Sequence, residues 1–165
     1  MQHLMGKKIG FIGGGAIGNV FVAALISAGF AREDLIVADV SQARRLVFEG
    51  EHRVAVTDDN SELVRLSDVV VLAVKPDVVV PVLQGLAEKG TVDLKRPLWI
   101  SVAAGVPIER IAGVLPEGAR IIRAMPNTPA LVHAGATAFY ANGQTSEEDR
   151  AVSYTHLTLP TIYSV

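Results

Sequence analysis

The chain has 165 residues, half of which are hydrophobic, and its formal net charge is −2 at pH 7. This composition supports the core of one ordinary domain, and it gives no electrostatic reason to expect nucleic acid or an anionic membrane as a partner. The absence of cysteine excludes disulfides, thiolate nucleophiles and cysteine-based zinc sites. No stretch reaches the roughly 20 apolar residues of a membrane span, so we expect a soluble, cytoplasmic protein.

The first half of the chain alternates short apolar strands with helices. The predicted strands cover residues 8–12, 34–40 and 53–56. The predicted helices cover residues 16–28, 42–49 and 59–66. Gly29 and Gly50 stand where the first two helices should end, and Ser41 is a good N-cap for the second.

The second half continues the alternation. The β-branched run at 69–74 is typical of a strand that is covered on both faces, and Pro76 suits the first turn of the helix after it. Further strands are predicted at 97–102 and 119–123, with helical stretches between them. Strands and helices that alternate across short turns predict an α/β fold of the Rossmann type, a doubly wound, mostly parallel sheet with helices on both faces.

The end of the chain departs from this pattern. A capped helix is predicted to begin at Ser146, with acidic residues in its first turn. After about Val152 the helical period is lost, and Pro160 would break a helix. We therefore expect residues 1–150 to form the domain and residues 151–165 to be a non-native tail.

Gly13, Gly15 and Gly18 form the pattern G-x-G-x-x-G between the first predicted strand and helix. In dinucleotide-binding domains the first glycine permits a tight turn, the second lets a pyrophosphate approach the backbone, and the third lets the helix pack closely. The N-terminus of the helix then offers N–H groups to the phosphates. The alternative is that the glycines only make a sharp turn. The flanking elements favour nucleotide binding.

Asp39 ends the second predicted strand, where an acidic residue can bond the hydroxyls of the adenosine ribose. A carboxylate there would disfavour the 2′-phosphate of NADP. The alternative is that Asp39 only helps to cap the following helix. Arg44 and Arg45 follow closely; they are either partners for a 2′-phosphate or ordinary solvated residues. The sequence thus leaves NADP or NAD open.

Three later strand ends carry candidate ligand residues. Lys75 either faces a cofactor or substrate or is an ordinary surface lysine. The small residues 101–105 either leave room for a flat ring or allow a helix to pack closely on the strand. Asn127, between two prolines, can offer a hydrogen-bond donor and an acceptor to a ligand. The alternative is that this segment is only a structural turn. The four histidines are scattered, so no metal site is predicted. No acid–base pair or nucleophile stands out, and the catalytic residue is unknown.

Three strings resemble pyrroline-5-carboxylate reductases: SDVVVLAVKPDVV at 67–79, SVAAGVPIERI at 101–111 and RIIRAMPNTPALVHAGATAFYA at 120–141. The likeness runs in order from about residue 8 to 150. It implies an NAD(P)-dependent oxidoreductase of proline biosynthesis, which transfers a hydride from NADPH or NADH to the C=N bond of 1-pyrroline-5-carboxylate and forms L-proline.

The resemblance also implies roles by position. Cofactor contacts are expected from the pyrophosphate loop (Gly13, Gly15, Ala16, Ile17, Gly18), near the adenosine ribose (Asn60), near the nicotinamide ribose (Ala73, Val74, Lys75, Pro76), beside the nicotinamide ring (Ala103, Ala104, Gly105) and in the loop beyond (Asn127). Ala16 and Ile17 stand where family members often have Asn or Gln and then Met or Leu. This loses a polar contact but keeps the backbone cradle.

The family has a second, all-helical domain that makes the dimer and supplies much of the substrate pocket. The resemblance implies that this C-terminal domain is absent here. We expect the chain to bind cofactor without reducing the substrate, and to be a monomer or weak dimer, while the full-length parent is a homo-oligomer. The alternatives are another dehydrogenase of the β-hydroxyacid dehydrogenase type and a non-catalytic nucleotide-binding module.

Overall fold

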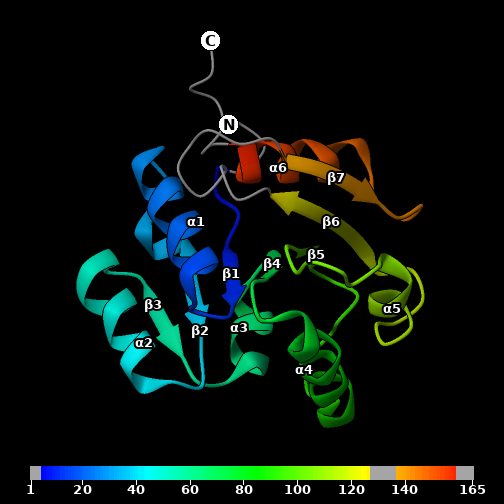
Figure 1. Cartoon of the computed structure of the whole chain (residues 1–165), viewed down its shortest axis with the longest axis horizontal. Coiled ribbons are helices and arrows are strands. Elements are labelled where there is room, and N and C mark those ends of the chain that lie inside the picture. The colour runs from blue at the N-terminus through cyan, green and yellow to red at the C-terminus, as the bar shows by residue number, and fades with distance from the viewer. Residues whose placement is uncertain (1–4, 127–136, 159–165) are drawn as a thin grey trace.

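A computed structural model describes residues 5–126 and 137–158 of the chain. The described strands are β1 (Ile9–Ile12), β2 (Leu35–Ala38), β3 (Ala55–Thr57), β4 (Val69–Leu72), β5 (Leu98–Ser101), β6 (Arg120–Pro126) and β7 (Thr137–Ala141). They form one sheet in the order β3-β2-β1-β4-β5-β6-β7 (Figure 1). Six strands are parallel, and β7 is antiparallel to β6. The predicted mostly parallel sheet is confirmed.

The helices of the described residues are α1 (Ala16–Ser27), α2 (Gln42–Val47), α3 (Asn60–Leu66), α4 (Pro76–Lys89), α5 (Ile108–Ala112) and α6 (Glu147–Thr158), with a 3-10 turn η1 (Arg32–Asp34) and a π turn η2 (Phe48–His52). Ser41 caps α2 as predicted, since its hydroxyl accepts a hydrogen bond from the Arg44 N–H at 3.4 Å. The helical path does not stop at Gly50, because η2 carries it to His52.

Helices cover the sheet in two layers, one on each face. Ile9 and Phe11 of β1 pack on one face with apolar residues of α1, η2 and α6. Ile12, the last residue of the same strand, packs on the opposite face with apolar residues of α3, α4 and α5. Because both faces are covered, all four residues of β1, β2, β4 and β5 are buried, which explains their continuous apolar sequence.

Two elements differ from the sequence prediction. Strand β7 was not predicted, although its sequence TAFYA is β-prone. Helix α6 was expected to lose its pattern after Val152, yet it continues to Thr158, and both Val152 and Ser153 are 2% exposed. The helix therefore enters the segment 151–165 that was predicted to be a tail. Its foreign origin stays a prediction.

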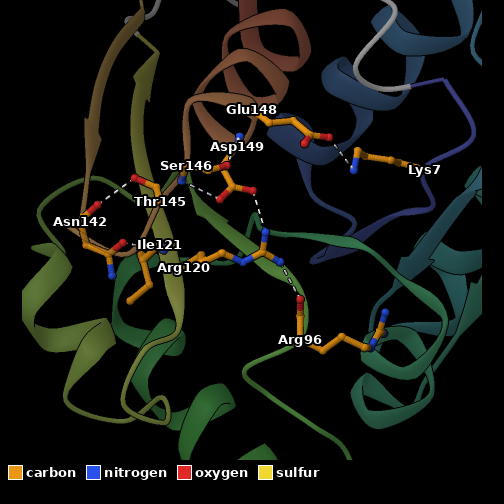
Figure 2. A network of polar contacts seen from close by, with 9 residues as sticks. All are labelled: Lys7, Arg96, Arg120, Ile121, Asn142, Thr145, Ser146, Glu148 and Asp149. Atoms are coloured by element: carbon orange, nitrogen blue, oxygen red, sulfur yellow. Dashed lines mark hydrogen bonds and ion pairs between the residues drawn. The ribbon is translucent and has the colours of Figure 1, made fainter.

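The start of α6 is fastened to the amino edge of the sheet by a polar network (Figure 2). Asp149 and Ser146 cap each other reciprocally, by hydrogen bonds of 2.9 and 3.1 Å between side chain and backbone N–H. The other oxygen of Asp149 accepts from the Arg120 guanidinium at 2.7 Å. Arg120 also donates to the carbonyl of Arg96 at 2.7 Å. The network fixes the direction in which α6 leaves the sheet.

Among the described residues, no helix is long and apolar enough to cross a membrane. Within the same residues, no three His, Asp or Glu side chains come together in a group that could hold a metal ion.

Candidate cofactor site

The glycine loop joins β1 to α1 at the carboxyl edge of the sheet. Gly13 has a φ of 109°, and a Cβ at this position would lie 2.6 Å from the carbonyl oxygen of Ala73. A Cβ on Gly18 would lie 2.5 Å from the carbonyl oxygen of Gly13. Both distances are shorter than any normal contact, so these glycines are needed to bring the loop against the end of β4 and α1 against the loop.

Gly15 differs from its neighbours because nothing lies within 4 Å of a Cβ placed there. It is the N-cap of α1 and offers no capping side chain, and the first turn of the helix contains no acidic residue. Among the described residues, no side chain caps the first N–H groups of this twelve-residue helix, and the space next to Gly15 is open. An anion fits this cradle, because helix N-termini attract negative charge and present N–H donors to it.

Asp39 follows β2 and is turned toward the glycine loop. Its Oδ2 accepts from the Gly14 N–H and its Oδ1 from the Ser41 N–H, both at 2.8 Å. The side chain is 6% exposed and lies 3.5 Å from Arg44. Both carboxylate oxygens thus already have backbone donors. Arg45 donates to the Asp39 carbonyl at 2.7 Å.

Asn60 begins α3 at the same edge of the sheet and is half-buried. Its neighbour Asp59 caps the helix by accepting from the Ser61 N–H at 2.9 Å. That hydrogen bond, aided by the positive charge of Lys89 at 3.6 Å, lowers the pKa of Asp59. The cap starts α3 shortly after β3, the strand that pairs with β2.

The ends of β4 and β5 complete the edge. Ile12, Leu72 and Ser101 stand in register as the last residues of β1, β4 and β5. The residues predicted to face the nicotinamide end come next. They are Ala73, Val74, Lys75 and Pro76 directly after β4 and, beyond Val102, Ala103, Ala104 and Gly105 after β5. Lys75 is exposed at the N-cap of α4, and Ala104 and Gly105 are exposed beyond the buried Ala103.

The structure therefore brings most of the predicted site residues to one edge of one sheet, where open α/β sheets bind their ligands. In the first turn of α1, Ala16 is exposed, whereas Ile17 packs partly on the core. Asn127 lies outside the described residues. Sequence reasoning missed Arg123 of β6, whose buried Nε has no hydrogen-bond partner. The signal was an arginine in the middle of a strand whose other charged residue, Arg120, stands at its start.

The fold and this edge define a dinucleotide-binding oxidoreductase domain. The chain belongs to the family described as NADP oxidoreductase, coenzyme F420-dependent, which matches residues 8–105. Within curated proteins it is 45% identical to a pyrroline-5-carboxylate reductase of Synechocystis over 139 residues, which are 84% of this chain and 50% of that protein. An Escherichia coli reductase of the same name is 35% identical over 148 residues, 89% of this chain and 54% of that protein.

Solved structures agree with these sequence similarities. A pyrroline-5-carboxylate reductase from Coxiella burnetii superposes with a TM-score of 0.86 at 35% identity, covering 93% of this chain and 56% of that one. The Plasmodium falciparum pyrroline carboxylate reductase, solved with NADP bound, has a TM-score of 0.79 at 26% identity, covering 94% and 55%. The predicted resemblance is confirmed, and the chain spans about half the length of the relatives it matches.

Proposed function

We propose that the chain is the cofactor-binding half of a reductase that transfers a hydride from NADPH or NADH to the C=N bond of 1-pyrroline-5-carboxylate, forming L-proline. The observation that carries this proposal is the open cradle at Gly15, in a chain 45% identical to a reductase of that name. The cradle follows β1, whose last residue is in register with the ends of β4 and β5.

The cofactor would lie along the carboxyl edge of the sheet. We assign the pyrophosphate to Gly13, Gly15, Ala16, Ile17 and Gly18, the adenosine ribose to Asp39 and Asn60, and the nicotinamide end to Ala73, Val74, Lys75, Pro76, Ala103, Ala104, Gly105 and Asn127. The order of these groups along the edge follows the strand order β2-β1-β4-β5.

The bound cofactor supplies the hydride, and the chain's own residues bind and orient it. The N–H groups at the start of α1 hold negative charge, and the small residues after β5 leave space for a flat ring. No described residue is in a clear position to give a proton to the imine nitrogen, so the proton donor is not assigned to this chain. Holding the two reactants together is itself worth several kcal/mol of the barrier.

Either nicotinamide cofactor suits the site, and Arg44 supports NADP. The side chain of Arg44 is 57% exposed and its guanidinium lies 3.5 Å from the Asp39 carboxylate, so it offsets the negative charge that would repel a 2′-phosphate. The match to a family of NADP oxidoreductases also favours NADP.

The partners and location in this proposal follow the resemblance. The ligand beside the cofactor is a small molecule, the protein is cytoplasmic, and the homo-oligomer of the full-length reductase forms through a helical domain that follows residue 150. The chain alone would be a monomer or weak dimer.

Oxidation of NADPH in the presence of 1-pyrroline-5-carboxylate tests the proposal. The full-length reductase should turn over, and the 165-residue chain should bind NADPH without turnover. If the full-length protein bound NADPH but reduced no imine, the nucleotide-binding module would be the better account. Turnover by the chain alone at the full-length rate would place the substrate site within these residues.

A further inference from the structure

The π turn η2 packs beside the glycine loop, although none of its residues belongs to the proposed cofactor site. The aromatic ring of Phe48 lies against Gly14, since a Cβ on that glycine would be 2.9 Å from the ring carbon Cε2. Phe48 is 1% exposed and packs in the same apolar cluster as Phe21 and Val22 of α1. A ring that fills this space determines how deeply the glycine loop can settle on the core.

The other end of the same turn contacts α1. The Nε2 of His52 lies 2.5 Å from the Oδ1 of Asn19. An amide oxygen can only accept a hydrogen bond, so the imidazole nitrogen is the donor. Asn19 also donates its backbone N–H to the carbonyl of Gly15 at 3.0 Å. The side chain of His52 is therefore attached to the helical turn that begins at the phosphate cradle.

His52 is itself held in place by contacts other than the one to α1. Its carbonyl accepts a hydrogen bond of 2.9 Å from the Nε–H of Arg32. Its ring centroid is 5.5 Å from that of Phe48. The Arg53 N–H closes the turn by donating to the carbonyl of Phe48, as in a π turn, which is a geometry frequent near functional sites. The imidazole is thus presented to α1 by a fixed backbone.

Together these contacts form a closed path beside the cradle. The path starts where Gly14 rests on Phe48, and it follows η2 to His52. It then crosses to Asn19 and returns through the first turn of α1 to Gly15. Groups that bind a ligand need their geometry held within about 0.5 Å by packing and hydrogen bonds from the residues behind them. The path supplies both kinds of support, packing at one end of η2 and a hydrogen bond at the other.

We propose that His52 is a positioning residue of the phosphate cradle. Its hydrogen bond to Asn19 fixes the first turn of α1 relative to the glycine loop that rests on Phe48, so that the N–H groups at the start of the helix are aimed at one anion. His52 acts through Asn19 and not on the cofactor itself. The inference rests on the proposed function only in taking NADPH or NADH as the ligand of the cradle.

Calorimetric titration of the full-length reductase with NADPH tests this, because it gives the Kd and the fraction of protein that can bind as separate quantities. His52→Leu removes the donor and should weaken NADPH binding about fivefold, as expected for one ordinary hydrogen bond, with one NADPH still bound per chain. His52→Gln, whose amide N–H can reach the same acceptor, should restore the affinity to within twofold of wild type. Glu51→Gln, at an exposed residue of the same turn, is the matched control and should leave the affinity unchanged.

Asn19→Ala removes the same hydrogen bond from the side of α1, and it keeps the test decisive if a His52 variant does not fold. It should weaken NADPH binding as much as His52→Leu does, and the double variant should bind no more weakly than either single variant, because all three lack the same bond. Affinities within twofold of wild type in both single variants, with a lowered Tm, would show a purely structural role and overturn the proposal. Equal losses in His52→Leu and His52→Gln would also overturn it. A wild type that binds NADPH but reduces no imine would reject the proposed function alone.

Discussion

The carboxylate of Asp39 holds the glycine loop, because its Oδ2 accepts a hydrogen bond of 2.8 Å from the backbone N–H of Gly14. Its Oδ1 accepts from the Ser41 N–H at the same distance. One buried side chain therefore connects the end of β2 to the phosphate cradle and to the start of α2. A change at Asp39 is expected to act on the shape of the loop as well as on the ribose.

Asp39→Ser is the first test. Two hydrogen bonds to a nearly buried charge are lost, which should lower the free energy of unfolding by about 2 kcal/mol or more. The ratio of the two affinities, for NADPH and for NADH, should shift toward NADPH, because the variant loses a ribose contact and no longer repels a 2′-phosphate. Titration of both cofactors by fluorescence measures this. An unchanged ratio would count against a ribose contact of Asp39.

Substitutions at two glycines of the loop should distinguish a loss of cofactor binding from a loss of stability. Gly15→Val meets nothing within 4 Å, so it should fold normally and lose NADPH binding at least tenfold. Gly18→Ala places a Cβ 2.5 Å from a backbone oxygen and should lose stability, by about 1–3 kcal/mol if strain is the cause. Gly85→Ala, in the open on α4, is the control and should gain about 0.5–1 kcal/mol. Urea unfolding and NADPH titration distinguish these outcomes, and equal effects at Gly15 and Gly18 would refute the distinction.

The polar network at the start of α6 should contribute more to the free energy of unfolding than a surface ion pair does. Asp149→Asn removes the carboxylate that Arg120 binds at 2.7 Å and that is 9% exposed, so a loss of about 1–3 kcal/mol is expected. Lys7→Met breaks the exposed pair with Glu148 and should cost less than about 1 kcal/mol. Hydrogen exchange should show faster opening of α6 in the first variant only. Unchanged protection of α6 in Asp149→Asn would mean that apolar packing alone holds the helix.

The lowered pKa of Asp59 gives a pH prediction. The hydrogen bond from the Ser61 N–H and the charge of Lys89 favour the ionised carboxylate in the folded state. Its stabilising contribution is therefore complete above the pKa of the unfolded chain, about 3.9, and is lost as the pH falls through the lower folded pKa. Asn is also a good N-cap, so Asp59→Asn isolates the charge. Urea unfolding at several pH values should show a wild-type advantage at neutral pH that shrinks below about pH 4; an advantage that is constant down to pH 3 would contradict this.

The alternating pattern of strands and helices was enough to predict the sheet and its glycine loop. The continuous apolar runs at β1 and β4 reflect burial on both faces of the sheet. The pattern G-x-G-x-x-G reflects two positions, Gly13 and Gly18, where the backbone packs too closely for a side chain. These are local constraints, and local constraints leave a direct trace in the sequence.

Long-range relationships left no such trace. The pairing of β7 with β6 joins segments on either side of residues 127–136, and the attachment of α6 to the sheet depends on Arg120, 29 residues before Asp149. The double hydrogen bonding of Asp39 needs the folded loop, and the isolation of Arg123 is visible only when its neighbours are known.

Binding of NADPH to the 165-residue chain tests the central claim most directly. Isothermal titration of the wild type and of Gly15→Val, each shown to be folded by circular dichroism, gives the answer in one pair of experiments. The account predicts one NADPH per chain in the wild type and at least tenfold weaker binding in the variant. Equal affinities in the two proteins, or no binding by the folded wild type, would contradict it.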